Sequence, residues 1–165
     1  MPRLVAIVPF AVAIGSPVAL AQDLQLPPLQ KQASPQAVID EHFAALNACD
    51  WKRIMAQYPA DYQLNLPDGV VIKGREKAGE LFAGFVKPVD QGGLCGIKFT
   101  PEQTFVVGET LNIQWRAEAP FLAEPYKGSD AYETHDGLMA AMVSTFKGDS
   151  LKMKEPATGS STPSK

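Results

Sequence analysis

The sequence predicts an α+β fold in which three N-terminal helices cover one face of a curved, mainly antiparallel sheet. Apolar residues recur at helical spacing over residues 35–86, whereas polar and apolar residues alternate over most of residues 97–146. Short turns that contain glycine join the later segments, and such turns connect antiparallel strands. The pattern therefore argues against a parallel, doubly wound sheet.

Three segments have the pattern of amphipathic helices. Ser34 and Pro35 supply the N-cap and the first helical residue of the first segment, in which apolar residues recur every three or four positions. The members of this stripe are Val38, Ile39, His42, Phe43, Ala45, Leu46 and Cys49. Asp50 is suited to cap a second, short helix over residues 51–57, and a third helix is predicted over residues 75–86.

The other periodic segments read as strands. They cover residues 62–66, 70–72, 97–100, 104–107, 111–117, 126–134 and 138–146. Alternation places Asp130, Tyr132 and Thr134 on one face of their strand and Glu133 on the other. A sheet that is too curved for its helices to fill leaves a cavity between the two layers, where small ligands usually bind.

Both ends of the chain differ from the predicted domain, which spans residues 34–153. Residues 1–21 combine Arg3, an apolar run and a small-residue site for cleavage after Ala21, as a secretory signal peptide does. The apolar run is too short to cross a bilayer, so we expect a periplasmic or secreted protein with no membrane anchor after cleavage; a buried N-terminal helix is the alternative. The remaining terminal segments are a Pro- and Gln-rich linker at 22–33 and a disordered tail at 154–165.

The composition argues against several classes of function. The chain has 15 Lys and Arg residues against 18 Asp and Glu residues, a net charge of −3 that is unlike that of a nucleic-acid-binding protein. Its 2 histidines and 2 cysteines form no cluster with the spacing of a metal site. A phosphate-binding glycine loop and a nucleophile elbow are also missing from the sequence. We therefore expect no metal, no cofactor and no nucleic-acid partner.

Three motifs in a characteristic order carry a family resemblance. They are HFAALNACDWKRIMAQYPADYQLNL, IKGREKAGELFAGFV and YETHDGLMAAMVSTF. In their order and spacing they resemble the superfamily of ketosteroid isomerases, SnoaL-like proteins and nuclear-transport-factor-2-like proteins. The resemblance implies a cone-shaped fold with three helices packed on a strongly curved sheet. It does not imply one activity, because this superfamily hosts unrelated functions.

Ketosteroid isomerases in this superfamily use a carboxylate base and an oxyanion hole made by a tyrosine and a protonated aspartate. The resemblance places His42 at the position of that tyrosine and Leu66 at the position of the base. The two supporting tyrosines and the oxyanion aspartate correspond to Tyr58, Phe82 and either Ser129 or Asp130. A leucine side chain cannot transfer a proton, so steroid isomerisation by this mechanism is not expected.

His42 and Asp130 are the candidates for acid–base chemistry. An imidazole with an ordinary pKa near 6.5 can donate, accept or exchange a proton. The alternative for His42 is a structural histidine bonded to Tyr58 or a backbone carbonyl. Asp130 is the best placed carboxylate if its strand face points inward. The side chains expected to line a ligand pocket, or else to pack in the core, are Tyr58, Leu66, Phe82 and Trp115.

Two cysteines allow two interpretations. Export permits a disulfide between Cys49 and Cys95. The alternative is that Cys49 is a small buried residue at a helix end and Cys95 a free thiol in a loop.

Three functions remain open at this point. The first is the binding of a small apolar molecule between the first helix and the sheet. The second is a cofactor-free isomerase, dehydratase or cyclase that uses His42 and Asp130 as acid and base. The third is a non-catalytic association module, for which the open face of the sheet would form a homodimer.

Overall fold

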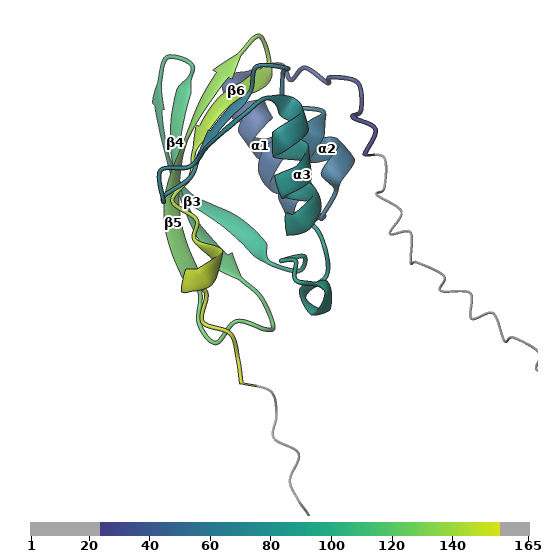
Figure 1. Ribbon diagram of the computed structural model, residues 1–165. Coiled ribbons are helices and arrows are strands. Elements are labelled where there is room, and N and C mark those ends of the chain that lie inside the picture. Colours follow the sequence, from purple (N-terminus) through teal and green to yellow (C-terminus); the bar gives the residue numbers. More distant parts are fainter. Residues whose placement is uncertain (1–23, 156–165) are drawn as a thin grey trace, which may run out of the picture.

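The computed structural model of the chain describes residues 24–155, in which three α-helices lie on one face of a six-stranded sheet (Figure 1). The helices are α1 (Pro35–Asn47), α2 (Trp51–Met55) and α3 (Arg75–Phe85), with two short 3-10 helices at Val89–Gln91 and Gly148–Ser150. The strands are β1 (Gln63–Asn65), β2 (Val71–Lys73), β3 (Lys98–Val107), β4 (Thr110–Glu118), β5 (Tyr126–His135) and β6 (Leu138–Val143). This two-layer arrangement confirms the α+β prediction.

The sheet has the strand order β2-β1-β6-β5-β4-β3. Every pair of neighbouring strands is antiparallel except β1 and β6, which run parallel. The sheet is therefore mainly antiparallel, as predicted. In Figure 1 it curves around the helices, which leaves its opposite face uncovered in the single chain. Phe105 and Val143, in β3 and β6, are exposed.

Helix α1 begins at the residues that predicted it. The Ser34 hydroxyl accepts a hydrogen bond from the Ala37 N–H at 3.2 Å, and Pro35 is the first helical residue. The face that α1 turns toward the sheet is buried and consists of Val38, Ile39, His42, Phe43, Ala45 and Leu46. Burial of this face holds one imidazole among the apolar side chains of the core.

Strand β3 corrects one prediction. The sequence pattern predicts two separate strands over residues 97–100 and 104–107, but the chain forms one strand whose pairing with β4 is irregular between Pro101 and Gln103. Proline has no N–H to donate to a neighbouring strand, so it is tolerated at a bulge or on an edge strand. Because β3 lies at the edge of the sheet, Pro101 interrupts the regular pairing without ending the strand.

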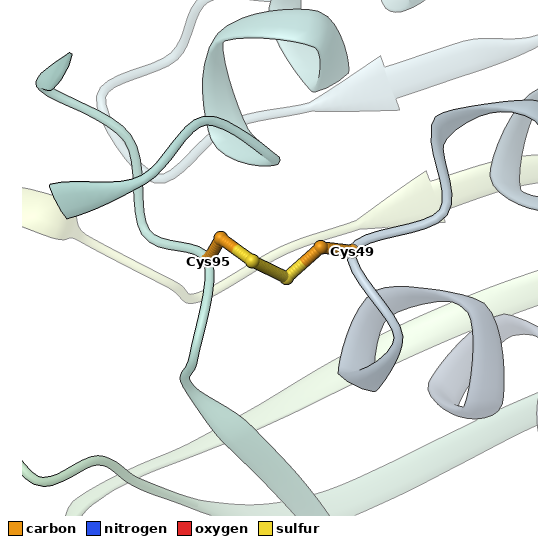
Figure 2. The surroundings of a disulfide bond; sticks show 2 residues. All are labelled: Cys49 and Cys95. Atoms are coloured by element: carbon orange, nitrogen blue, oxygen red, sulfur yellow. A yellow bond between two sulfur atoms is a disulfide. The ribbon is translucent and has the colours of Figure 1, made fainter.

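A disulfide joins the end of α1 to the loop before β3 (Figure 2). The sulfur atoms of Cys49 and Cys95 are 2.09 Å apart and their Cα atoms are 5.6 Å apart. Of the two interpretations that the sequence allowed, the structure therefore has the bonded one. The bond closes the segment of the chain that contains α2, β1, β2 and α3.

Residues 24–33 are extended, but they are held against the domain rather than free as a linker. The Gln30 N–H donates to the carbonyl of Ala56, and the Gln32 N–H donates to that of Gly137, both at 2.8 Å. A Cβ added at Gly137 would lie 2.3 Å from the Gln32 oxygen, so the close approach of the two segments requires glycine. This part of the predicted linker belongs to the folded unit.

Arg75, the first residue of α3, links residues 24–33 to the end of α2. Its Nη2 donates to the carbonyl oxygen of Met55 at 2.7 Å and also to that of Pro27. Met55 is the last residue of α2, and Arg75 is the first of α3. Arg75, which lies in the motif IKGREKAGELFAGFV, thus has a structural role.

The described residues, 24–155, leave out parts of both predicted ends of the chain, including residues 22–23 of the predicted linker. The predicted signal peptide, residues 1–21, lies outside the described residues, as do residues 156–165 of the predicted tail. In the described part of the chain, none of the helices has the length and apolar character needed to span a membrane.

Candidate functional site

A cavity of about 80 Å³ lies between the helices and the inner face of the sheet. Its apolar wall consists of Phe43, Leu46, Leu64, Leu66, Leu81, Phe82, Phe85, Phe99, Met142 and Phe146. The side chains that bring polar atoms to it are His42, Trp115, Asp130, Tyr132 and Ser144. The predicted cavity between the two layers is therefore present, and aromatic rings form much of its wall.

The cavity approaches the surface near Leu66 and Phe146. Both residues are only partly buried, and both also border a surface hollow next to Asp68 and Asp149. Phe146 follows β6, which ends at Val143, earlier than the sequence pattern predicts. The segment after Val143 leaves the sheet and contributes Ser144 and Phe146 to the cavity wall. We refer to Leu66 and Phe146, the two wall residues that also border the surface hollow, as the mouth of the site.

His42 is placed in the cavity wall by α1 and is 0% exposed. Its Nδ1 lies 3.4 Å from the Tyr58 hydroxyl, whereas its Nε2 has no hydrogen-bond partner in the part of the chain described. Burial lowers the pKa of His42 to about 3, because a charged imidazolium would lose its hydration. At neutral pH the ring is therefore uncharged, which makes it a hydrogen-bonding group and a very weak base.

Asp130 enters the cavity from β5. Its strand alternates as predicted, since Asp130, Tyr132 and Thr134 are buried while Glu133 is exposed. The Oδ1 atom accepts a hydrogen bond from the Thr145 N–H at 2.7 Å, and Oδ2 accepts one from the Tyr132 hydroxyl at 3.4 Å. Burial raises the pKa of the Asp130 carboxyl, and the bond from Thr145 partly opposes this change.

Tyr132 connects the two candidate acid–base residues. The centroid of its ring is 5.6 Å from that of His42 in an edge-on arrangement, and its hydroxyl donates to Asp130. His42 and Asp130 therefore lie on the same side of the sheet and face one cavity. The sequence placed Tyr132 on the inward face with Asp130 but did not identify it as a member of the site.

Trp115 contributes a buried donor on β4. The side chain is 1% exposed, and its indole Nε1 has no hydrogen-bond partner among residues 24–155. The indole is close enough to Asp130 to oppose the rise in the pKa of that carboxyl, but the two groups do not meet with hydrogen-bond geometry. Gly128 lies against the same indole. A Cβ added at Gly128 would be 2.3 Å from Trp115 Cζ2, so a larger residue would clash with the ring.

The structure places three of the four predicted pocket residues in the cavity wall, namely Leu66, Phe82 and Trp115. Tyr58 instead packs in the core, which is the other outcome that the sequence allowed for it. It is 0% exposed, lies behind His42 and stacks on Tyr62 with ring centroids 4.0 Å apart. Tyr58 therefore orients the imidazole instead of contacting the cavity.

Residues 24–155 contain no group of three or more His, Cys, Asp or Glu side chains arranged to hold a metal ion. His135, the second histidine of the chain, is exposed in the turn between β5 and β6, near Glu109 and Asp136.

Comparison with known proteins identifies a family that this sequence matches. The sequence model of the SnoaL-like domain matches residues 39–154. A comparison with curated protein sequences found no significant match.

Solved structures share the fold at low sequence identity. An NTF2-like protein of unknown function from Cytophaga hutchinsonii is 14% identical, with a TM-score of 0.56 over 73% of this chain and 96% of that one. TerC, co-crystallised with polyporic acid, is 17% identical, with a TM-score of 0.56 over 68% and 91% of the two chains. A computationally designed 17-OHP binder is 18% identical, with a TM-score of 0.58 over 76% and 100%.

Proposed function

We propose that this chain, which belongs to the SnoaL-like domain family, binds a small, largely apolar molecule in the cavity between α1 and the sheet. The observation that carries the proposal is a cavity with a mostly aromatic and aliphatic wall, two of whose residues, His42 and Trp115, each have a buried polar atom (Nε2 and Nε1) without a partner among the described residues. Ligand sites commonly combine an apolar wall with a few such polar groups.

The volume sets the size of the molecule. Apolar cavities of about 150 Å³ bind benzene in proteins. The present cavity, at about 80 Å³, is about half that volume, so a single ring enters only if the side chains at its mouth move outward. Leu66 and Phe146 are suited to such movements because both are partly exposed. Two proteins of similar fold, TerC with polyporic acid and the designed 17-OHP binder, support the use of this fold for binding small molecules.

Binding is favoured over acid–base catalysis by the state of His42. A general base works best when its pKa is close to the working pH, whereas burial lowers the pKa of His42 to about 3. The position that the resemblance assigns to a carboxylate base is occupied by Leu66. We therefore propose that His42 contributes hydrogen bonding within a binding site.

Blocking the mouth tests this function. The variant Leu66→Trp adds bulk to the cavity wall at a partly exposed position, so it is expected to abolish binding without unfolding the protein. We expect saturating one-ring aromatic probes, such as toluene and indole, to raise the Tm of the unmodified protein by roughly 5–10 °C, and to leave that of Leu66→Trp unchanged.

Leu29→Trp is the matched control, because Leu29 is 43% exposed and lies outside the cavity wall. It is expected to respond to the probes as the unmodified protein does. The proposal fails if none of the probes shifts the Tm, or if both tryptophan variants respond equally.

We propose in addition that the protein is exported. The disulfide between Cys49 and Cys95 supports this, because such bonds persist mainly in oxidising compartments. Cleavage after Ala21 would leave Gln22 as the first residue, just before the segment that is held against the domain. N-terminal sequencing of the protein from periplasmic or culture fractions is expected to begin at Gln22. Recovery only in the cytoplasm, with residues 1–21 retained, would refute export.

A further inference from the structure

Two residues of the cavity wall, His42 and Trp115, limit the chemistry of a bound molecule. His42 Nε2 and Trp115 Nε1 are buried in side chains that are at most 1% exposed, and neither has a hydrogen-bond partner in the described part of the chain. Buried polar groups in folded proteins are nearly always hydrogen-bonded. These two atoms therefore mark positions where a bound molecule gains by presenting a polar atom.

Trp115 restricts the chemistry of a bound molecule more than His42 does. An indole N–H is a donor only, whereas the role of a neutral imidazole nitrogen depends on its tautomer. The carboxyl next to the indole, Asp130, accepts hydrogen bonds from the Thr145 N–H and the Tyr132 hydroxyl, and it leaves the indole N–H without a partner. A molecule that satisfies Trp115 must consequently present a hydrogen-bond acceptor to it.

The charges around the cavity restrict that acceptor further. The described wall contains no lysine or arginine, and Asp130 is its single carboxyl group. His42 supplies no positive charge at neutral pH, since burial lowers its pKa to about 3. An anionic group placed here would lose its hydration without gaining a counter-charge. The site therefore disfavours a carboxylate and favours an uncharged acceptor.

Aromatic rings surround the donor. The Trp115 ring centroid lies 5.4 Å from that of Phe99 and 6.1 Å from that of Phe146. Such an enclosure suits a planar ring, which can pack against these faces and edges. The wall and the donor together define a site for a flat molecule with one polar atom.

From this donor, charge and shape we infer that the cavity selects a neutral molecule of about one aromatic ring whose acceptor, such as a carbonyl oxygen, takes a hydrogen bond from Trp115 Nε1. The inference rests on the proposed function, because it names the class of ligand for the same cavity.

Three probes of nearly equal size separate this inference from apolar binding alone. Acetophenone carries the carbonyl, α-methylstyrene replaces its oxygen by a methylene group, and benzoate carries a negative charge. Dissociation constants from NMR titration are expected to favour acetophenone over α-methylstyrene by about tenfold or more, as for a hydrogen bond made to an otherwise unsatisfied buried donor. Benzoate is expected not to bind.

The indole N–H signals give a direct readout, because the chain has 2 tryptophans. Acetophenone is expected to move the Trp115 signal downfield, and α-methylstyrene is not. Trp115→Phe removes the N–H and keeps an aromatic ring, so the preference between the two probes should disappear. Trp51→Phe is the matched control, since Trp51 donates to the Gly79 carbonyl at 2.8 Å and lies outside the cavity wall.

The outcomes distinguish the two proposals. Equal affinity for acetophenone and α-methylstyrene, or an unmoved Trp115 signal, overturns the inference and leaves apolar binding intact. Tight binding of benzoate overturns it as well. If no probe binds, the proposed function fails together with the inference. If Trp115→Phe fails to fold, the probe comparison and the indole signals of the unmodified protein still test the inference.

Discussion

Replacing both Cys49 and Cys95 by alanine is expected to lower the free energy of unfolding by about 4 kcal/mol. The disulfide spans a sequence separation of 46 residues, so it strongly restricts the unfolded chain. Its removal makes the unfolded state more favourable, because the segment with α2 and α3 is no longer closed into a loop. Urea denaturation of the variant and of the unmodified protein measures the difference.

The reduced form of the unmodified protein is the control for this prediction. Replacing the two half-buried cysteines also removes the packing of their sulfur atoms, which is a cost separate from that of the lost cross-link. Reduction breaks the cross-link while both side chains remain. A reductant should therefore lower the urea midpoint of the unmodified protein and leave that of the double variant unchanged. A midpoint that is insensitive to reductant would contradict the prediction.

Gly128→Ala is expected to destabilise the protein by about 2–3 kcal/mol, as overpacking of a core does. The added Cβ would lie 2.3 Å from Trp115 Cζ2 and 2.9 Å from Thr145 Oγ1. The indole must move to relieve this contact, so the variant should also lose affinity for aromatic probes. Thermal unfolding and NMR titration with acetophenone measure the two effects.

Gly84→Ala is the matched control for the same substitution. Gly84 lies within α3, and a Cβ added there meets no atom within 4 Å. Because alanine favours helix more than glycine, this variant should be as stable as the unmodified protein or more so by about 0.5–1 kcal/mol. Equal destabilisation by the two substitutions would show that the contact with Trp115 is not what makes glycine necessary at position 128.

Local signals in the sequence were sufficient to predict most of the fold. The cap at Ser34 and the spacing of the apolar stripe fix the start and the buried face of α1. Strand β3 was predicted as two strands, whereas the chain forms one strand in which Pro101 is tolerated because it lies next to a bulge at the edge of the sheet. Whether a strand is an edge strand depends on pairings that are distant in sequence.

The position of a candidate site residue was predictable where it depended only on the direction of that side chain from its own helix or strand. Alternation along β5 gave the inward position of Asp130, and the stripe of α1 gave that of His42. The contact between Tyr58 and His42 was among the alternatives that the sequence offered, but the stacking of Tyr58 on Tyr62 was not predictable, because it depends on how the core packs. The unpartnered donor of Trp115 likewise depends on which atoms surround it in the folded chain.

The pairing of Cys49 with Cys95 and the docking of residues 24–33 also required the three-dimensional fold. The two cysteines are distant in sequence, so their proximity follows from how α1 packs against the start of β3. The docked segment is rich in proline and glutamine and resembles a linker. It is held by backbone hydrogen bonds, such as the one from the Gln30 N–H to the Ala56 carbonyl. Backbone hydrogen bonds depend little on residue type, so the sequence does not reveal them.

A crystal of the protein under xenon pressure tests the central claim most directly, because dry apolar cavities in proteins take up xenon. We expect one strong xenon peak in the cavity between α1 and the sheet, within contact distance of Trp115 and Phe99. A space filled by side chains, or by ordered water bonded to His42 Nε2 and Trp115 Nε1 with xenon absent, would contradict an apolar binding site.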